Sequence, residues 1–406
     1  MTAGGRVLRI GLISLTILLL SGLAGFLWLR TTPYWAGVTL FSEGKRVENF
    51  RNMQDVFPYR DVPRDGDVWA FASDPQPLPE TYIFDGETKD LNVFLSETVT
   101  TGLLVVHDGA ITYEDYRLGA DDTARFTSWS VAKSILSALI GIALEDGHIA
   151  SLDDPIEAYV PAFAGSGYAG VTIEQALTMS SGVAFDENYD DAFSDVNQLF
   201  ISLAIGTPLQ EILAELGRDR APGSYNNYIS SDSIALGLVL EAATGMPAED
   251  YLATRLWGPM GAERAGFWNT GRIGSVLPFC CFNAALRDYA RFGRLYLEGG
   301  ARNGDQIIPT DWIARSTEPS APHLEPGDNP ASFLTFGYGY HWWIPEEPQG
   351  DFLAIGIWGQ FIYVAPMRDV VIVKTSADDG FDDRDHETVA MFRAIAQSVS
   401  EDFGAD

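Results

Sequence analysis

The chain has 406 residues, and 46% of them are hydrophobic, so it can bury a sizeable core in one large domain or two. Its 56 acidic residues against 26 basic ones give a formal net charge of −30. A protein this acidic offers no basic patch that could follow a phosphate backbone, which excludes nucleic acid as an expected partner. The five histidines show no metal-ligand spacing, and no glycine-rich phosphate loop follows a strand, so no metal or other cofactor is expected.

The first predicted element is a hydrophobic segment near the N-terminus. Residues 10–29 are twenty residues without a charge, and Arg6 and Arg9 precede them. As a helix this segment spans about 30 Å, the thickness of a bilayer core. The arginines favour a cytoplasmic N-terminus and an exported remainder, on the periplasmic or extracellular side. A cleaved signal peptide is the alternative, but its apolar region is usually shorter. We therefore expect residues 1–30 to form an uncleaved membrane anchor.

The rest of the chain is expected to form a lead-in segment over residues 31–75 and one domain over residues 76–406. Two β-rich runs flank Asp108-Gly109, which predicts a hairpin. A helix then begins near Ser130 and ends at Gly147. Several helical patterns with long loops fill residues 150–300. The C-terminal part returns to strands and closes with a helix over roughly residues 384–400.

This order of elements predicts an α+β fold. Strands at both ends of the domain would build one antiparallel sheet flanked by helices, and the middle of the chain would form a helical insert beside it. A functional site is then expected between the sheet and the insert.

Ser130 and Lys133 are the first candidate catalytic residues. Positions i and i+3 share one face of a helix, so the two side chains would touch. A lysine with a lowered pKa can take the proton of a serine and make it a nucleophile, and the apolar run that follows supplies the dry surroundings. The same pattern occurs at Ser42 and Lys45, in a polar stretch without burial, where no reactivity is expected. The prediction that Ser130 is reactive therefore depends on its apolar surroundings, and not on the Ser-x-x-Lys pattern itself.

Four stretches place Ser130 in a family context. They read "SWSVAKS", "SLDDPIEAYVPAF", "LTMSSGV" and "NAALRDYARFGRLYL". Together they resemble the serine β-lactamase-like superfamily, and most closely its class C-related esterase and 6-aminohexanoate-dimer hydrolase branch. The resemblance implies a β-lactamase/transpeptidase-like fold, with Ser130 as the nucleophile and Lys133 as the catalytic lysine.

The second motif of this superfamily is a Tyr-x-Asn or Tyr-x-Ser, for which the chain offers two overlapping matches. Tyr225-Asn226-Asn227 fits the letters better, whereas Tyr228-Ile229-Ser230 has the family's spacing. We choose Tyr228 because spacing determines geometry. The resemblance implies that its phenol relays a proton to the leaving group and that Ser230 orients it.

The third motif, normally Lys-Thr-Gly or His-Thr-Gly on an edge strand, reads Ile357-Trp358-Gly359 here. The resemblance implies that Trp358 and Gly359 contact the substrate and that the N–H of Gln360 completes an oxyanion hole with the N–H of Ser130. The basic residue and the hydroxyl are missing. Lys374-Thr375-Ser376 matches in part but lacks the glycine, so we interpret Lys374 as the end of a strand.

The two cysteines, Cys280 and Cys281, are neighbours in sequence. A bond between adjacent cysteines closes no stabilising loop and would be strained. The sequence therefore predicts two small buried residues and no disulfide.

These residues predict a serine hydrolase that acts on neutral carboxylic esters or small amides through an acyl-enzyme. A substrate carboxylate would meet no cation at the third motif, so little turnover of penicillins is expected. Two alternatives remain: a non-catalytic or slowly acylating penicillin-binding-like sensor, and a true β-lactamase or DD-peptidase.

Overall fold

The computed structural model describes residues 3–30 and 34–401, with side chains for residues 10–30 and 35–401. The chain divides into two compact units, one ending at Phe57 and the other beginning at Pro58. The predicted segments also include residues 1–2, 31–33 and 402–406, which lie outside the described residues. Residues 58–75, which the sequence assigns to the lead-in segment, contribute two strands to the larger unit.

The smaller unit contains α1 (Ala3–Leu29), α2 (Tyr34–Val38) and α3 (Arg46–Asn49). Within α1, Ile10–Leu29 is 20 residues long with a mean hydropathy of 2.3, and none of its apolar window is buried. The helix is therefore long and apolar enough to cross a membrane, and a signal sequence has the same properties.

The centre of the larger unit is an eight-stranded sheet in the order β12-β13-β14-β15-β16-β5-β6-β2. All neighbours are antiparallel except β2 and β6. The predicted hairpin is confirmed: β5 and β6 flank Asp108 and Gly109, which both adopt positive φ. The strands are β2 (Ala72–Ser73), β5 (Thr100–His107), β6 (Ala110–Tyr116), β12 (Gly337–Tyr338), β13 (Trp343–Ile344), β14 (Phe352–Gly356), β15 (Gln360–Ala365) and β16 (Val370–Ser376).

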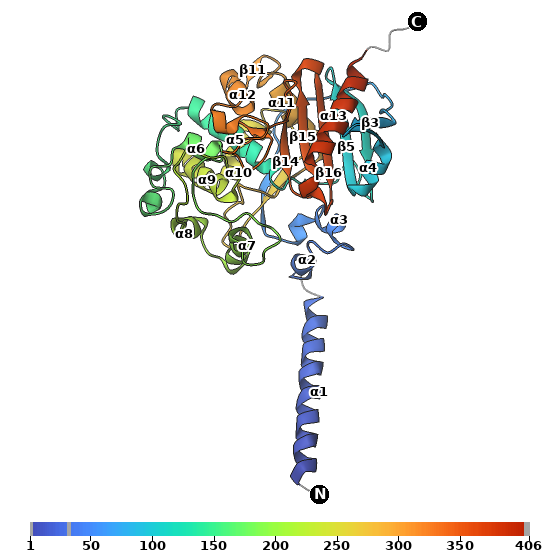
Figure 1. Ribbon diagram of the computed structural model, residues 1–406, viewed down its shortest axis with the longest axis vertical. Coiled ribbons are helices and arrows are strands. Elements are labelled where there is room, and N and C mark those ends of the chain that lie inside the picture. The colour runs from blue at the N-terminus through green and yellow to red at the C-terminus, as the bar shows by residue number, and fades with distance from the viewer. Residues whose placement is uncertain (1–2, 31–33, 402–406) are drawn as a thin grey trace. The chain divides into compact units, whose positions relative to one another are not determined.

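Helices cover both faces of this sheet, which is why β5 and β16 read as continuous apolar runs instead of alternating ones. On one face, α13 (Asp385–Ser400) packs Phe392 and Ile395 against the core and lies across β15, β16 and β5 (Figure 1). On the other face lies α11 (Leu286–Leu297). A Cβ at Gly293 of α11 would lie 2.6 Å from Val371 and 2.9 Å from Ile362, so only glycine permits this close approach.

A helical part lies beside β14, as predicted (Figure 1). Its central helices α5 and α9 pack against each other. The helices are α5 (Val131–Glu145), α6 (Ile173–Leu177), α7 (Asp195–Ile205), α8 (Leu209–Ala214), α9 (Ser230–Thr244), α10 (Ala248–Leu252) and α12 (Thr310–Thr317). A helix α4 (Leu91–Glu97) and the hairpin β3 (Thr81–Phe84) and β4 (Glu87–Asp90) complete the outer edge. The α+β prediction with a helical insert is confirmed.

A second, four-stranded sheet brings the start of the larger unit to the start of α5. Its order is β1-β8-β9-β7, with β1 (Tyr59–Val62), β8 (Gly266–Asn269), β9 (Phe282–Ala284) and β7 (Phe126–Thr127). Strand β7 leads directly into Ser130, so this sheet fixes the entry of the chain into α5.

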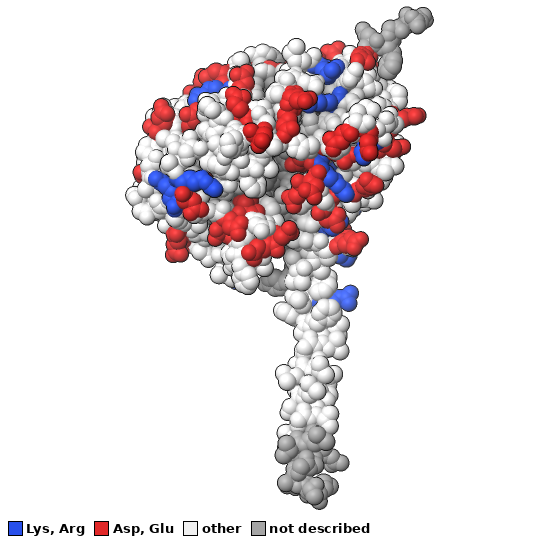
Figure 2. All heavy atoms as spheres, viewed as in Figure 1, with Lys and Arg blue, Asp and Glu red and all other residues white. Residues whose placement is uncertain are grey.

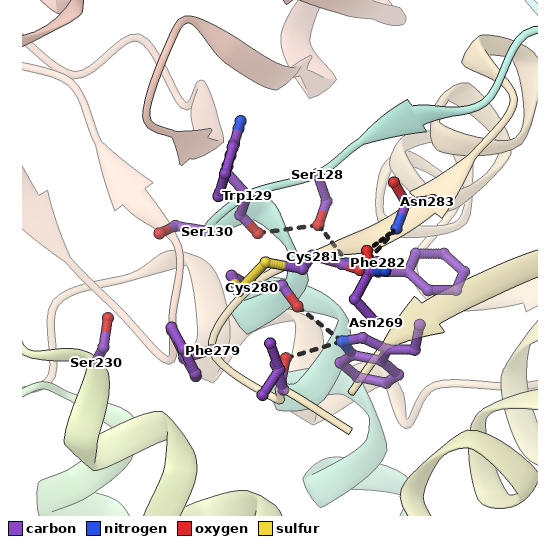
Figure 3. The surroundings of a disulfide bond; sticks show 12 residues. Ser128, Trp129, Ser130, Ser230, Asn269, Phe279, Cys280, Cys281, Phe282 and Asn283 are labelled. Carbon is purple, nitrogen blue, oxygen red and sulfur yellow. Dashed lines mark hydrogen bonds between the residues drawn. A yellow bond between two sulfur atoms is a disulfide. The ribbon is translucent and has the colours of Figure 1, made fainter. Parts of the chain in front are cut away.

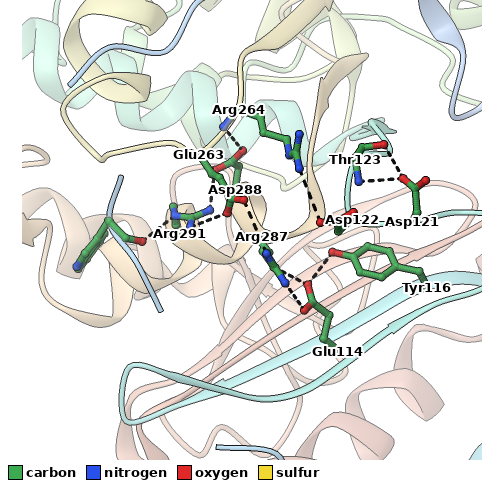
Figure 4. A network of polar contacts seen from close by, with 11 residues as sticks. Glu114, Tyr116, Asp121, Asp122, Thr123, Glu263, Arg264, Arg287, Asp288 and Arg291 are labelled. Carbon is green, nitrogen blue, oxygen red and sulfur yellow. Dashed lines mark hydrogen bonds and ion pairs between the residues drawn. The ribbon is translucent and has the colours of Figure 1, made fainter. Parts of the chain in front are cut away.

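An ionic network around the buried pair Arg291 and Asp288 ties α11 to its neighbours (Figure 4). Arg291 pairs with Asp288 at 2.9 Å and with Glu263 at 3.0 Å, and Asp288 also accepts the backbone N–H groups of Glu263 and Arg264. Arg287 binds Glu114 of β6 through two contacts of 2.7 Å. The charged residues Arg287, Asp288 and Arg291 of the "NAALRDYARFGRLYL" stretch therefore hold α11 against its neighbours.

Most of the other charged side chains are exposed or partly exposed, and Lys133, Asp232 and Lys374 are among the buried exceptions. On the face drawn in Figure 2, acidic side chains are spread over the larger unit and outnumber basic ones. Acidic side chains exposed to solvent therefore account for the net negative charge on this face.

Candidate active site

A cavity of about 570 Å³ opens where the helical part meets the sheet. Ser130 lies on its wall at the N-terminus of α5. The rest of the lining comes from the loops before α7, α9 and β12, from β13, from the end of β14 and the turn after it, from the segment after β16, and from the first residue of α13. The lining residues are Ser130, Phe185, Asp186, Glu187, Asn188, Tyr189, Asp190, Asn227, Tyr228, Ile229, Phe333, Leu334, Trp343, Ile355, Ile357, Phe381, Asp382 and Asp385. No group of three or more potential metal ligands occurs among residues 3–30 and 34–401.

Ser130 and Lys133 meet as the sequence predicted. The Ser130 Oγ and the Lys133 Nζ lie 3.0 Å apart, one turn along α5. The preceding residue, Trp129, has φ of 42°, a left-handed conformation that is rare for a bulky side chain. The serine is 8% exposed and reaches the cavity, whereas the lysine behind it is 2% exposed.

Lys133 has two further partners. Its Nζ lies 2.8 Å from the Phe279 carbonyl oxygen and 3.3 Å from the Ser230 Oγ. Burial lowers the pKa of Lys133 to about 8, and the negative charge of Glu187 opposes this shift. The neutral form of the Lys133 amine is therefore populated much closer to neutral pH than that of an ordinary lysine.

Of the two candidate tyrosines, Tyr228 is the one at the cavity. Its ring centroid lies 4.8 Å from the Lys133 Nζ, and it stacks on Trp343 at 5.3 Å. Burial raises the pKa of Tyr228, and a hydrogen bond with Ser130 opposes that rise. Tyr225 does not line this cavity, and its ring packs under the guanidinium of Arg220 at 4.3 Å.

Ser230 begins α9 and connects Lys133 to a residue that the sequence analysis missed. Its backbone N–H and its Oγ lie 2.8 Å and 2.5 Å from the two carboxylate oxygens of Glu187. Tyr189 donates its phenolic proton to the same carboxylate at 2.7 Å. The segment "FDENYDD" gave no signal for this role, because Glu187 and Ser230 are 43 positions apart and meet only through the tertiary fold.

The loop that carries Glu187 is held by its own polar contacts. The Asp186 N–H binds Asp195 at the start of α7, and the Asn197 amide donates to the carbonyl groups of Tyr189 and Asp191. These bonds attach the loop to the N-terminal turn of α7, and this attachment determines where Glu187 lies.

The third motif requires a correction. Gly356 at the end of β14 is the residue that comes close to Ser130: a Cβ there would lie 2.5 Å from the Ser128 carbonyl oxygen and 3.0 Å from the Ser130 N. Ile357, the next residue, lines the cavity. The motif therefore lies about three residues earlier than the sequence indicated, because a three-residue turn joins β14 and β15.

Trp358, Gly359 and Gln360 were expected to contact the substrate or its oxyanion, but they are not among the cavity-lining residues that the structure describes. Trp358 packs on Phe381 at 5.6 Å. Gly359 faces Lys374 and Ser376 on the other side of the turn. The Gln360 amide donates to the carbonyl oxygens of Ser376 and Trp358, at 2.8 Å and 3.0 Å.

Lys374 is not a simple strand end either. It is 1% exposed inside β16, and its Nζ donates to the Ser376 Oγ at 2.6 Å. Burial lowers the pKa of Lys374 to about 7, and Asp378 opposes this shift. The space beside it is about 10 Å³, so no substrate reaches this amine.

The prediction for the cysteines was half wrong. Cys280 and Cys281 are buried, as expected, but they form a disulfide. Cys281 has φ of 67°, and this left-handed backbone lets two neighbouring side chains turn toward each other. Figure 3 shows the disulfide between the Ser128–Ser130 segment and Phe279. The Trp268 indole donates to the Cys280 carbonyl at 2.7 Å, which holds the segment that supplies the Phe279 carbonyl to Lys133.

Similar proteins are known for most of the chain. It is 29% identical over 296 residues to the 6-aminohexanoate-dimer hydrolase of Paenarthrobacter ureafaciens, covering 71% of this chain and 75% of that protein. It is 26% identical over 274 residues to Penicillin-binding protein 4 of Amycolatopsis lactamdurans, covering 59% of this chain and 68% of that one.

Two solved structures share the fold. The protein described as "Putative 6-aminohexanoate-dimer hydrolase from Bacillus anthracis" superposes with a TM-score of 0.81 at 23% identity, over 89% of this chain and 96% of that one. A family VIII carboxylesterase superposes with a TM-score of 0.59 at 16% identity, over 75% and 94%. The sequence profile of the Beta-lactamase family matches residues 95–395, most of the larger unit. This chain belongs to the Beta-lactamase family.

Proposed function

We propose that the protein is a serine hydrolase that acts on carboxylic esters or small amides through an acyl-enzyme. The observation that carries the proposal is the 3.0 Å contact of the Ser130 Oγ with the Lys133 Nζ, at a cavity wall and with the pKa of the lysine lowered to about 8. Ser130 attacks the substrate carbonyl while Lys133 takes its proton, and water later releases the acid.

The developing oxyanion lies between the backbone N–H groups of Ser130 and Ile357. The close approach of Gly356 to the Ser130 N, and the position of Ile357 at the cavity, support this pair over the earlier choice of Gln360. The phenol of Tyr228, which burial keeps protonated at neutral pH, donates its proton to the leaving group, and the ammonium of Lys133 then restores that proton to Tyr228.

The cavity lining supports neutral substrates. Its apolar part includes Trp343, Ile355 and Ile357, which gain about 0.8 kcal/mol for each substrate CH₂ that they bury. Its charged residues are all acidic, and no lysine or arginine belongs to the described lining. The carboxylate of a penicillin would lose its water there without gaining a cation, a cost of at least about 1–3 kcal/mol.

The experiment compares kcat/KM for a short-chain nitrophenyl ester with kcat/KM for a chromogenic cephalosporin, using the purified protein in detergent. We expect the ester value to be the larger. A cephalosporin value well above the ester value would favour a true β-lactamase. Stoichiometric release of nitrophenol followed by a stop would favour the penicillin-binding-like sensor.

We also propose that α1 anchors the protein in a membrane with the larger unit exported. The uncharged segment Ile10–Leu29 and the arginines before it support this orientation. A phosphatase reporter fused after Asp406 is expected to be active, and extraction should require detergent. A mature N-terminus near Ala24 would instead identify a cleaved signal peptide.

A further inference from the structure

Glu187 has a set of contacts that the steps above do not use. Its carboxylate accepts the backbone N–H of Ser230 at 2.8 Å, the Ser230 hydroxyl at 2.5 Å and the Tyr189 hydroxyl at 2.7 Å. An ionised carboxylate can only accept hydrogen bonds. The single hydroxyl proton of Ser230 is therefore directed toward Glu187.

This direction decides what Ser230 can offer to Lys133. With its proton on the Glu187 side, the Ser230 Oγ presents only lone pairs to the Lys133 Nζ, 3.3 Å away. The other neighbour, the Phe279 carbonyl oxygen at 2.8 Å, is also an acceptor only. Two of the three positions around the Lys133 nitrogen must therefore carry N–H bonds.

A neutral amine has two N–H bonds and one lone pair. Because Phe279 and Ser230 take both N–H bonds, the lone pair is left for the third neighbour, the Ser130 Oγ at 3.0 Å. We propose that Glu187 is a positioning residue that, by orienting the Ser230 hydroxyl, aims the lone pair of Lys133 at the nucleophile. The proposal rests on the hydrolase function proposed above.

The proton transfer balances on these atoms. When Ser130 attacks, its Oγ–H bond breaks and a third N–H bond forms on Lys133, so the ammonium donates to Phe279, Ser230 and Ser130. Without Glu187 the Ser230 hydroxyl is free to rotate and to donate to the Lys133 lone pair. That arrangement competes with Ser130 for the base.

The other titratable groups beside Lys133 do not take this role. Tyr228 stays protonated because burial raises its pKa. His341, whose Nδ1 lies 3.0 Å from the Lys133 carbonyl oxygen, stays neutral because burial lowers its pKa to about 3. Glu187 is thus the charged group that acts on Lys133, and it raises the pKa of that lysine against the effect of burial.

The test measures the second-order rate of Ser130 phosphonylation by a fluorophosphonate between pH 5.5 and 10, in the full-length protein. For Glu187→Gln we expect the plateau rate to fall about 10- to 100-fold and the midpoint of the pH profile to move to lower pH. For Glu187→Asp, which keeps the charge but shortens the reach, the plateau should fall while the midpoint stays near that of the unaltered protein. Asp191→Asn is the matched control, because it removes an exposed carboxylate of the same loop that does not line the cavity, and its midpoint should change little.

A double-mutant cycle tests the route through Ser230. If Glu187 acts by orienting that hydroxyl, Ser230→Ala should lower the plateau, and adding Glu187→Gln should lower it no further. The proposal would be overturned if the rate losses of the two single variants multiplied in the double variant. It would also be overturned if the plateau rate of Glu187→Gln equalled that of the unaltered protein. If the unaltered protein is not labelled at Ser130, the hydrolase function itself has failed, which distinguishes the two outcomes.

Discussion

The larger unit contains two buried lysines that resemble each other closely. Lys133 and Lys374 are 2% and 1% exposed, each lies within 3.0 Å of a serine Oγ, and burial lowers the pKa of both, to about 8 and about 7. They differ in access. Ser130 opens onto a cavity of about 570 Å³, whereas the space beside Lys374 is about 10 Å³.

This comparison shows that a desolvated amine next to a hydroxyl is not enough for a reactive site. Ser130 also lies at the N-cap of α5, at the end of a helix where backbone N–H groups have no partner within the helix. Ser376 lies at the end of a buried strand, and its carbonyl is bonded to the Gln360 amide. A lowered pKa indicates function only where substrate can reach the group.

The largest expected difference between the two lysines is in reaction rate. Lys133→Ala should lower kcat/KM for a nitrophenyl ester by about 10³-fold or more, because Ser130 loses its base. Lys374→Met should change it by less than about tenfold, since no substrate touches this residue. Steady-state kinetics at pH 8, with circular dichroism to verify folding, measures both. Equal losses in two folded variants would show that access to substrate does not distinguish the two lysines.

A smaller effect is expected in the pH dependence. Lys133 acts as a base only when neutral, so kcat/KM should rise with pH and level off above the pKa of Lys133, about 8. Lys374→Met should leave this midpoint in place. A pH–rate profile with the ester between pH 6 and 10 tests the assignment. A midpoint that moves in Lys374→Met would show that the midpoint reports the titration of Lys374 instead of Lys133.

The smallest effect is expected in stability. The pKa of Lys374 falls from 10.5 to about 7 on folding, so between these values the unfolded chain binds more protons. The free energy of unfolding should therefore rise with pH, by at most about 1.4 kcal/mol per unit for this group. Lys374→Met should reduce that slope between about pH 7 and 9 in urea titrations. Lys89→Met, at an exposed ion pair with Glu87, is the control and should leave the slope unchanged.

Much of the fold followed from local patterns. The β5–β6 hairpin was readable because Asp-Gly separates two β-rich runs, and α5 because an apolar run ends at Gly147. Ser130 and Lys133 were readable because they are three residues apart on one helix. In each case the residues that interact are close in sequence, so their spacing along the chain predicts how they lie in the structure.

What the sequence did not reveal depends on distant contacts. Glu187 reaches Ser230 across 43 positions, and no pattern near either residue marks that pairing. The third motif was misplaced because only the register of β14 against β15 shows that Gly356, rather than Gly359, faces Ser130. The Cys280–Cys281 bond depends on a left-handed backbone at Cys281, which the surrounding sheet and the Trp268 indole hold.

The most direct measurement is site-mapped labelling of the full-length protein with a fluorophosphonate, followed by peptide mass spectrometry. We expect one modified residue, Ser130, with labelling lost in Ser130→Ala and retained in Ser376→Ala. Modification of Ser376 or Ser42, or labelling that survives Ser130→Ala, would contradict the assignment of the nucleophile.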